Sequence, residues 1–386
     1  MKKSNKPAVP QSYGHKKEEV VRTLRNRILS NSYPAGSRLP TVDELVSEFD
    51  YSRTTMQQAI RQLQEEGFVE TVNRKGLFVS ANPPHRHRIG IVFPCSKNSP
   101  NWTKFFATFL EELPNVDFGS TTYEFDCYHL EGCDKLDHEF ARLKQNIASK
   151  TLAGLILHKG AIARVRSIPD YNSLPVILIN ESPKAAGTLP VIKTDSNVFL
   201  NKAMSWFSER KRTKVASITA VSIPQLKPSI AKKYGLKTKN HWFCATGING
   251  YGMIPNLIHL LLDYPNDERP DALLIANDQL ADIAVNAVTE HGLHIGSDID
   301  IVAHCNWPKT SQYLLPVRRL GFHAHDFIRA SVKLIEEQRL KHQIEAETLI
   351  PALYDNEVDR DSRNGDNRND GDRYSHELDE TDAFVL

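Results

Sequence analysis

The chain has 386 residues, of which 40% are hydrophobic and 25% are charged, and its formal net charge is +1. This composition excludes a disordered chain, and the length suits about two or three domains. The balanced charge gives no overall field toward nucleic acid or membranes, so any such signal must be local. The five cysteines form no C-x-x-C pair, and no apolar run reaches the roughly 18 to 20 residues of a membrane helix. With no secretory signal peptide apparent, we expect a cytoplasmic protein.

The two ends of the chain carry opposite charge. Residues 1–88 hold 15 Lys and Arg against 9 Asp and Glu, a net charge of +6. Residues 355–386 hold 11 Asp and Glu against 4 Arg, a net charge of −7, and few apolar side chains. Such a segment cannot bury enough apolar surface to offset its ordering entropy. We therefore predict a disordered acidic tail over 356–386, which could shield the basic amino-terminal region.

Helical spacing of apolar residues predicts three short helices near the amino terminus. Thr41 is a candidate N-cap with Glu44 as its capping-box partner, and Ser52 is a candidate cap for a helix that begins at Arg53. Two strand-like pieces, 67–72 and 76–79, then flank a basic turn. This order is typical of a helix-turn-helix followed by a wing, in a domain that we place at 12–80. A small helical protein-interaction domain is the alternative.

Several spaced motifs make this stretch resemble the winged helix-turn-helix of the GntR family of regulators. The motifs are Tyr33-Pro34-Ala35-Gly36, Arg38-Leu39-Pro40, Asp43-Glu44-Leu45, Ser52-Arg53-Thr54-Thr55, Glu66-Gly67-Phe68-Val69 and Lys75-Gly76-Leu77-Phe78-Val79. The resemblance implies binding to double-stranded DNA through the start of the second helix of the motif and through the wing. The implied DNA-binding residues are Arg38, Thr41, Ser52, Arg53, Thr54, Thr55, Gln57, Arg74, Lys75 and Gly76.

Two positions of the helix-turn-helix depart from the family pattern. Asp43 and Gln57 stand where many members have arginine. Phosphate attraction should be weaker there, so the operator sequence is expected to differ. An aspartate that faces DNA can accept a hydrogen bond from a cytosine amino group, or it can orient a neighbouring arginine.

A proline pair at 83–84 marks a linker over 81–88, because proline favours extended backbone in its neighbour. Beyond it, short apolar runs alternate with amphipathic stretches, as in parallel sheets covered by helices on both faces. The runs are 89–93, 152–157, 176–179, 215–218, 272–276 and 299–303. The region after the linker has about 265 residues, more than one hydrophobic core of this kind usually holds, so two lobes are predicted. The predicted fold is an α+β winged helix-turn-helix followed by a two-lobed α/β domain with Rossmann-like lobes and parallel sheets.

The region 89–355 resembles the effector-binding and dimerisation domain of LacI/GalR-type repressors, which is similar to periplasmic binding proteins. The segments that carry the resemblance are 88–92, 152–157, 175–180, 194–195, 271–278 and 299–302. The combination of a GntR-type DNA-binding domain with this effector domain resembles the arabinose-repressor subgroup of the GntR family. The resemblance implies a homodimer that binds a palindromic operator and responds to a small molecule.

Ligands of open α/β sheets bind outside the carboxyl ends of the strands, where this sequence places polar and aromatic residues. Amides, carboxylates and an aromatic face suit a sugar or a sugar derivative. Asp195 and Asp278 are equally good candidates for helix N-caps. Cys305 stands where the family has a sugar-binding Asp, and no arginine occurs between Arg212 and Arg269, where Lys227 is a possible substitute. The candidate effector-binding residues are Ser96, Asn98, Trp102, Asn180, Asp195, Asn277, Cys305 and Asn306.

No motif indicates an enzyme, a cofactor or a metal site. The sequence lacks a P-loop, G-x-S-x-G and H-E-x-x-H. Cys127, His129 and Cys133, like His85 with His87, lack a second ligand pair at zinc spacing. We therefore expect a ligand-responsive DNA-binding regulator, most simply a repressor. The alternative is a non-enzymatic sugar-binding protein whose amino-terminal module binds proteins.

Overall fold

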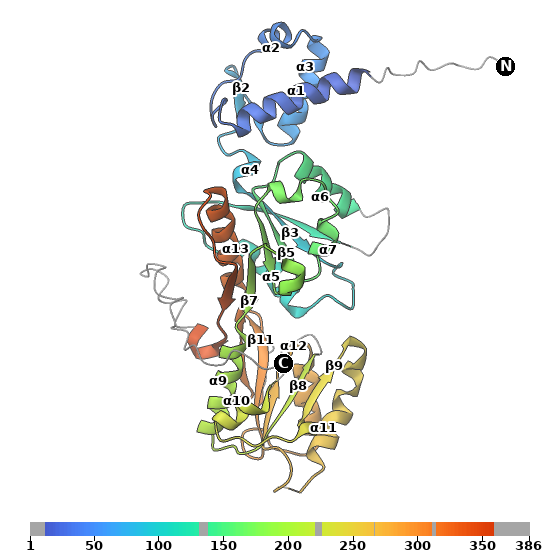
Figure 1. The fold of residues 1–386 in the computed structure, drawn as a ribbon, viewed down its shortest axis with the longest axis vertical. Helices are drawn as coiled ribbons and strands as arrows, with labels where there is room; N and C mark the ends of the chain where they lie inside the picture. Colours follow the sequence, from blue (N-terminus) through green and yellow to red (C-terminus); the bar gives the residue numbers. More distant parts are fainter. Residues whose placement is uncertain (1–11, 131–137, 221–225, 266, 311–313, 359–386) are drawn as a thin grey trace, which may run out of the picture. The chain divides into compact units, whose positions relative to one another are not determined.

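The computed structural model describes residues 12–130, 138–220, 226–265, 267–310 and 314–358 (Figure 1). The chain forms two compact units. Unit 1 comprises Met1–Lys193 and His325–Ile350, and unit 2 comprises Thr194–Ala324 and Pro351–Leu386. The chain therefore passes three times between the units. The acidic tail predicted from residue 356 lies, except for residues 356–358, outside the described residues.

The amino-terminal part of unit 1 is a three-helix domain with a two-stranded wing. Its elements are α1 (Ser12–Leu29), α2 (Val42–Phe49), α3 (Arg53–Glu65), β1 (Val69–Val72) and β2 (Gly76–Val79). Leu24, Leu45, Met56, Leu63 and Phe68 are fully buried among these elements. The wing strands are antiparallel, with Val69 opposite Val79 and Val72 opposite Gly76. The predicted helix-turn-helix and wing are confirmed.

The proline pair forms only in part the extended backbone that was predicted for the linker. Pro83 is extended, but Pro84 begins a short helix, α4 (Pro84–His87). Proline suits the first position of a helix, because its fixed φ is helical and its missing N–H would have no partner there. Pro83, Pro84 and His87 are buried, so this segment packs against its surroundings.

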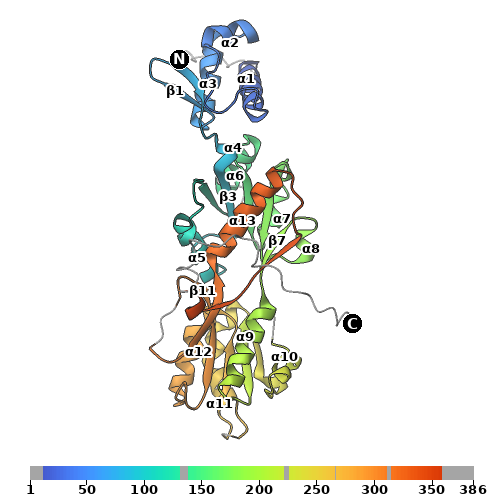
Figure 2. The same ribbon diagram turned by 90° about the vertical axis from the view of Figure 1, so that its left-hand side faces the viewer.

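Unit 1 also contains a six-stranded sheet that we call lobe 1, with strand order β13-β7-β6-β5-β3-β4. The strands are β3 (Arg88–Phe93), β4 (Glu124–His129), β5 (Gly154–His158), β6 (Val176–Ile179), β7 (Val191–Thr194) and β13 (Glu347–Ile350). The helices are α5 (Lys104–Glu112), α6 (His138–Ala148), α7 (Ile162–Val165), α8 (Pro183–Ala186) and α13 (Ala324–Arg339). From β4 to β7 neighbouring strands pair in parallel. Helix α13 crosses the sheet so closely that a Cβ on Gly154 would lie 2.8 Å from Ile335 (Figure 2).

Unit 2 holds a second six-stranded sheet, lobe 2, with order β14-β12-β11-β10-β8-β9. Its strands are β8 (Val215–Ala220), β9 (Phe243–Thr246), β10 (Ala272–Ile275), β11 (Asp300–Trp307), β12 (Arg318–His323) and the antiparallel β14 (Leu353–Tyr354). Its helices are α9 (Ser196–Glu209), α10 (Pro228–Lys233), α11 (Ile254–Leu262) and α12 (Asp278–Glu290). The other pairs are parallel. Two lobes with mainly parallel sheets are thus confirmed.

No helix in the described part of the chain has the length and apolar character to span a bilayer.

A buried carboxylate ties the start of β11 to the end of α9 and the residues that follow it. Asp300 is 1% exposed, and its side chain accepts hydrogen bonds from Arg210 Nε at 3.1 Å and Arg212 Nε at 2.7 Å.

We predict that Asp300→Asn lowers the thermal midpoint of unit 2, because removal of one partner of a buried ion pair costs about 3 kcal/mol. Differential scanning calorimetry would measure this change. Asp263→Asn, which removes a more exposed carboxylate beside His291, should shift the midpoint far less. Equal shifts would contradict the expectation.

Candidate DNA-binding interface and ligand-binding residues

Both helices of the helix-turn-helix begin at side-chain caps. Thr41 Oγ1 accepts from Glu44 N at 3.3 Å, and Glu44 Oε2 accepts from Thr41 N at 2.7 Å, which completes the predicted capping box. This backbone bond lowers the pKa of Glu44. Ser52 Oγ accepts from Thr55 N at 3.2 Å, so Ser52 is the N-cap of α3. The backbone at the start of α3 is thereby held by a bond to its own N-cap.

Most of the predicted DNA-binding residues are exposed. The exposed members are Arg38, Thr41, Ser52, Arg53, Thr54, Gln57, Arg74, Lys75 and Gly76. Thr55 differs, because it is 2% exposed and its hydroxyl lies 2.9 Å from Ser52 Oγ. Its side chain is therefore occupied in holding the start of α3, and its remaining role in DNA binding stays a prediction.

The wing places three cations near one turn. Arg74 adopts the left-handed conformation with φ 62°, and Lys75 N donates to Val72 O at 2.9 Å. Gly76 has φ 107°, and a Cβ there would lie 3.6 Å from Arg38 Nε. The Arg38 guanidinium thus packs against the wing, and Arg74 and Lys75 extend its positive surface.

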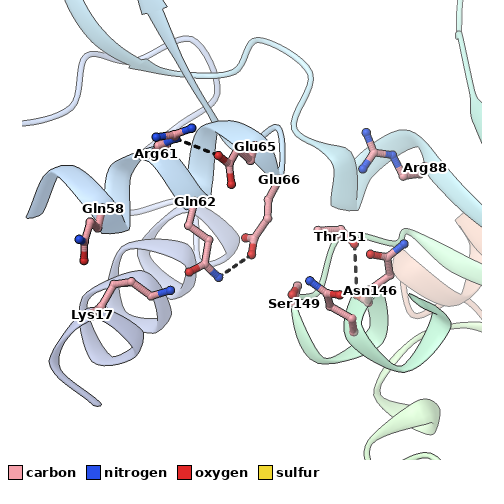
Figure 3. A pocket seen from close by; sticks show the side chains of 11 residues that line it. Lys17, Gln58, Arg61, Gln62, Glu65, Glu66, Arg88, Asn146, Ser149 and Thr151 are labelled. Atoms are coloured by element: carbon pink, nitrogen blue, oxygen red, sulfur yellow. Dashed lines mark hydrogen bonds and ion pairs between the residues drawn. The ribbon is translucent and has the colours of Figure 1, made fainter. Parts of the chain in front are cut away.

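The cavity seen beside this domain is a polar gap of about 640 Å³ (Figure 3). Its walls are side chains that already bond one another, such as Arg61 with Glu65 at 3.0 Å and Gln62 with Glu66 at 2.9 Å. None of the predicted effector-binding residues lines it. We therefore do not assign the effector to this cavity.

In lobe 1 the predicted effector-binding residues follow β3 and β6. Ser96 and Trp102 are half-buried, and Asn98 is exposed. Asn180 comes directly after β6 with φ 54°. The Trp102 ring lies 5.0 Å from the ring of Phe93, the last residue of β3. Trp102 is therefore anchored on the end of β3.

Two histidines at strand ends join this aromatic cluster, and the sequence analysis did not select them for the effector site. The Phe93 ring stacks on His158 at 4.5 Å and on His129 at 5.1 Å. Burial lowers the pKa of both histidines, and that of His158 falls to about 3. Within the described residues, neither ring nitrogen of His158 has a hydrogen-bond partner. The end of a buried strand was the only sequence signal for His158, whereas His129 ends the edge strand β4, which is not among the predicted apolar runs.

Glu181 is a buried carboxylate whose bonds are internal to lobe 1. It accepts from Gly160 N at 2.8 Å and from Ser182 N at 2.9 Å. It therefore joins the loops after β5 and β6.

In lobe 2 the predicted residues gather where β10 and β11 end. Asn277 is the N-cap of α12, and its Oδ1 accepts from Gln279 N at 2.8 Å. Asp278 is the first residue of that helix and accepts from Asn306 Nδ2. Cys305 is 6% exposed, and burial raises the pKa of its thiol. Asn277, Asp278 and Asn306 therefore form one polar cluster, and Cys305 precedes Asn306 on β11.

The other candidate cap is Asp195, whose Oδ1 accepts from Val198 N at 2.9 Å at the start of α9. The N-cap interpretation is thus confirmed for Asp195. It is wrong for Asp278, because Asn277 takes the cap.

An arginine of lobe 2 lies on the strand next to Cys305 and Asn306, in an element that the sequence analysis did not consider. The Arg319 guanidinium lies 5.3 Å from the Trp307 ring, and its Nη1 donates to Thr310 Oγ1 at 2.9 Å. Arg319 belongs to β12, one strand beyond Cys305 and Asn306. The exposed Lys227 is therefore not the only cation available to lobe 2.

No group of three or more potential metal ligands occurs in the ranges that the structure describes. Cys133 of the weighed Cys127, His129 and Cys133 set lies outside those ranges.

Known proteins resemble the two parts of the chain separately and together. Residues 16–79 match the family of bacterial regulatory proteins, gntR family. The arabinose metabolism transcriptional repressor of Geobacillus stearothermophilus is 24% identical over 315 residues, which cover 74% of this chain and 80% of that repressor. The lactose operon repressor of Escherichia coli K12 is 44% identical over 48 residues, 12% of this chain and 13% of that repressor.

A regulatory protein of the LacI family from Chloroflexus aggregans has the same fold. Its solved structure matches with a TM-score of 0.52 at 14% identity, and the match covers 69% of this chain and 96% of that chain. The chain therefore combines a GntR-type winged helix-turn-helix with two lobes that have the fold of LacI-type regulators. This architecture confirms the resemblance found in the sequence.

The buried His158 predicts a pH dependence of stability. Its pKa is lower in the folded chain than in the unfolded chain, so the unfolded chain binds the extra proton, and stability falls as the pH drops below about 6.5 toward 3. Between pH 7 and pH 5 this effect costs about 2 kcal/mol. His158→Phe should lose less stability over that interval, as measured by urea titration. The exposed His294 offers the control His294→Asn, and a wild-type pH dependence in both variants would contradict the assignment.

Proposed function

We propose that this chain is a transcription regulator whose amino-terminal domain binds double-stranded DNA and whose two lobes bind a small-molecule effector. The observation that carries the proposal is the exposed first turn of α3. Ser52 caps this turn, Arg53 and Thr54 are exposed on it, and the same domain has a basic wing. Side chains at this position of a helix-turn-helix reach base edges and phosphates. The named relatives, which are repressors of sugar metabolism, support a repressor.

The proposed effector is a sugar or a sugar derivative. The amide side chains of Asn277 and Asn306, the Asp278 carboxylate and the Arg319 guanidinium supply donors and acceptors in lobe 2. In lobe 1, Trp102 supplies an aromatic ring from the same loop as Ser96 and Asn98. Cys305 would contact the ligand as a neutral thiol, because its raised pKa disfavours the thiolate. A thiol cannot replace the two acceptor oxygens of a carboxylate, so the effector should need fewer hydroxyl contacts there.

The proposed mechanism is a shift between populations. If the effector binds one arrangement of the lobes more tightly, it raises the population of that arrangement. The affinity of the DNA-binding domains for their operator then changes. A single head reads only a short half-site, so we expect a homodimer on a palindromic operator. This function is binding rather than catalysis, and it requires no cofactor.

The proposed domain boundaries are the DNA-binding domain at 12–80, the connecting segment at 81–88, the effector domain at 89–355 and the tail from 356. Glu357 Oε1 and Oε2 accept from Lys202 Nζ at 2.8 Å. A truncation of the tail should therefore begin after Val358 rather than at Asn356.

Lys75→Ala should weaken binding to any double-stranded DNA and reduce the slope of log affinity against log salt by about 1, because a phosphate contact carries no sequence information. Fluorescence anisotropy with a DNA of random sequence measures both quantities. Lys333→Ala, which removes an exposed cation on α13, is the matched control. The wing assignment fails if the two variants behave alike.

A thermal-shift panel of pentoses, hexoses, polyols, sugar acids and sugar phosphates should contain a dose-dependent hit. A ligand at 100 times its Kd adds about 2.7 kcal/mol to the free energy of unfolding. Asn98→Ala should weaken that hit without moving the ligand-free midpoint, because Asn98 is exposed. A panel without any stabilising compound would contradict the carbohydrate assignment.

A further inference from the structure

An exposed ion pair joins the two helices of the helix-turn-helix at their amino-terminal turns. Arg53 is the first residue of α3, and Asp43 is the second residue of α2. Arg53 Nη1 donates to Asp43 Oδ1. The two side chains remain 61% and 74% exposed, respectively. The guanidinium is therefore held on one side while the rest of it faces outward.

Stability does not explain this pair. An exposed ion pair contributes about 0 to 1 kcal/mol, because water screens the charges and both side chains lose rotamer freedom. The ends of both helices are already satisfied by other residues, α2 by Thr41 with Glu44 and α3 by Ser52. What the pair does change is the direction of the Arg53 side chain.

We propose that Asp43 is a specificity-determining residue that positions Arg53 to read a guanine in each operator half-site. The inference rests on the proposed DNA-binding function. Guanine presents N7 and O6 as two acceptors in the major groove, and an arginine fork donates to both. With Nη1 bonded to Asp43, the Nε and Nη2 donors of the Arg53 guanidinium remain available for the base. A prepositioned side chain also loses less conformational entropy on binding.

The charge of Asp43 favours the same outcome. A carboxylate on the DNA-facing surface repels phosphates, so it disfavours a position in which Arg53 bonds the DNA backbone. Arg74 and Lys75 differ in this respect, because neither makes an ion pair within the described residues and both are exposed. We therefore assign the base contact to the paired arginine and the phosphate contacts to the free cations of the wing.

The experiment is a selection from a random double-stranded DNA library by the full chain, followed by affinities for the selected site and for the same site with its guanine replaced. The wild type should prefer guanine by roughly 5- to 150-fold, the range of one bidentate contact. Asp43→Asn should lose most of this preference while binding random DNA as tightly or more tightly, since it removes a negative charge. Arg53→Lys should also lose it while keeping its salt dependence, because lysine lacks the fork.

Glu65→Gln is the matched control. Glu65 pairs with Arg61 on the same helix α3, with side-chain exposures of 65% and 80%, so this variant removes the same charge and a similar exposed pair. It should keep the guanine preference. Circular dichroism confirms that each variant is folded.

Two results would overturn the proposal. If Asp43→Asn keeps the wild-type preference, or if the wild type selects a site without a preferred guanine, Asp43 does not position Arg53, although the chain still binds DNA. If the wild type enriches no sequence at all, the proposal fails together with the proposed DNA-binding function.

Discussion

The interior strands of these lobes must bury both of their faces, and the layout of the molecule follows from that constraint. A parallel strand covered by helices on both sides has no polar face, so it appears in the sequence as a short apolar run. In β6, for example, the four residues Val176–Ile179 are all buried. Most polar groups then follow where the strand ends, and parallel strands end at the same edge of their sheet. Asn180 after β6 and Asn277 after β10 occupy such positions.

The same constraint explains which elements the sequence predicts. The interior strands β3, β5, β6, β8, β10 and β11 were predicted to within a few residues. The strands β4, β7, β9 and β12 were not predicted as apolar runs. The strands β4 and β9 lie at sheet edges, β12 begins with Arg318 and Arg319, and the four-residue β7 ends in Lys193 and Thr194, which are only half-buried. The returns of the chain to lobe 1 through β13 and to lobe 2 through β14 have no local signal, since they depend on long-range pairing. In contrast, the helix-turn-helix depends on local caps, which are visible as single residues.

The candidate ligand residues were predicted only in part for a related reason. Residue type and position identified Asn277, Cys305 and Asn306, which lie at or just after the ends of the neighbouring strands β10 and β11. Their partners are a matter of packing: Asp278 bonds Asn306, and Arg319 arrives from a neighbouring strand. The stacking of His129 and His158 on Phe93 likewise depends on three strands lying side by side.

The proposed function requires its two binding activities to be coupled. The most direct test is to measure the affinity for a library-selected DNA with and without a saturating amount of the carbohydrate that stabilises the protein. The account predicts a change of about 5- to 150-fold, together with an equal change in carbohydrate affinity when DNA is bound, because coupling free energy is reciprocal. The same DNA affinity with and without the carbohydrate would contradict it.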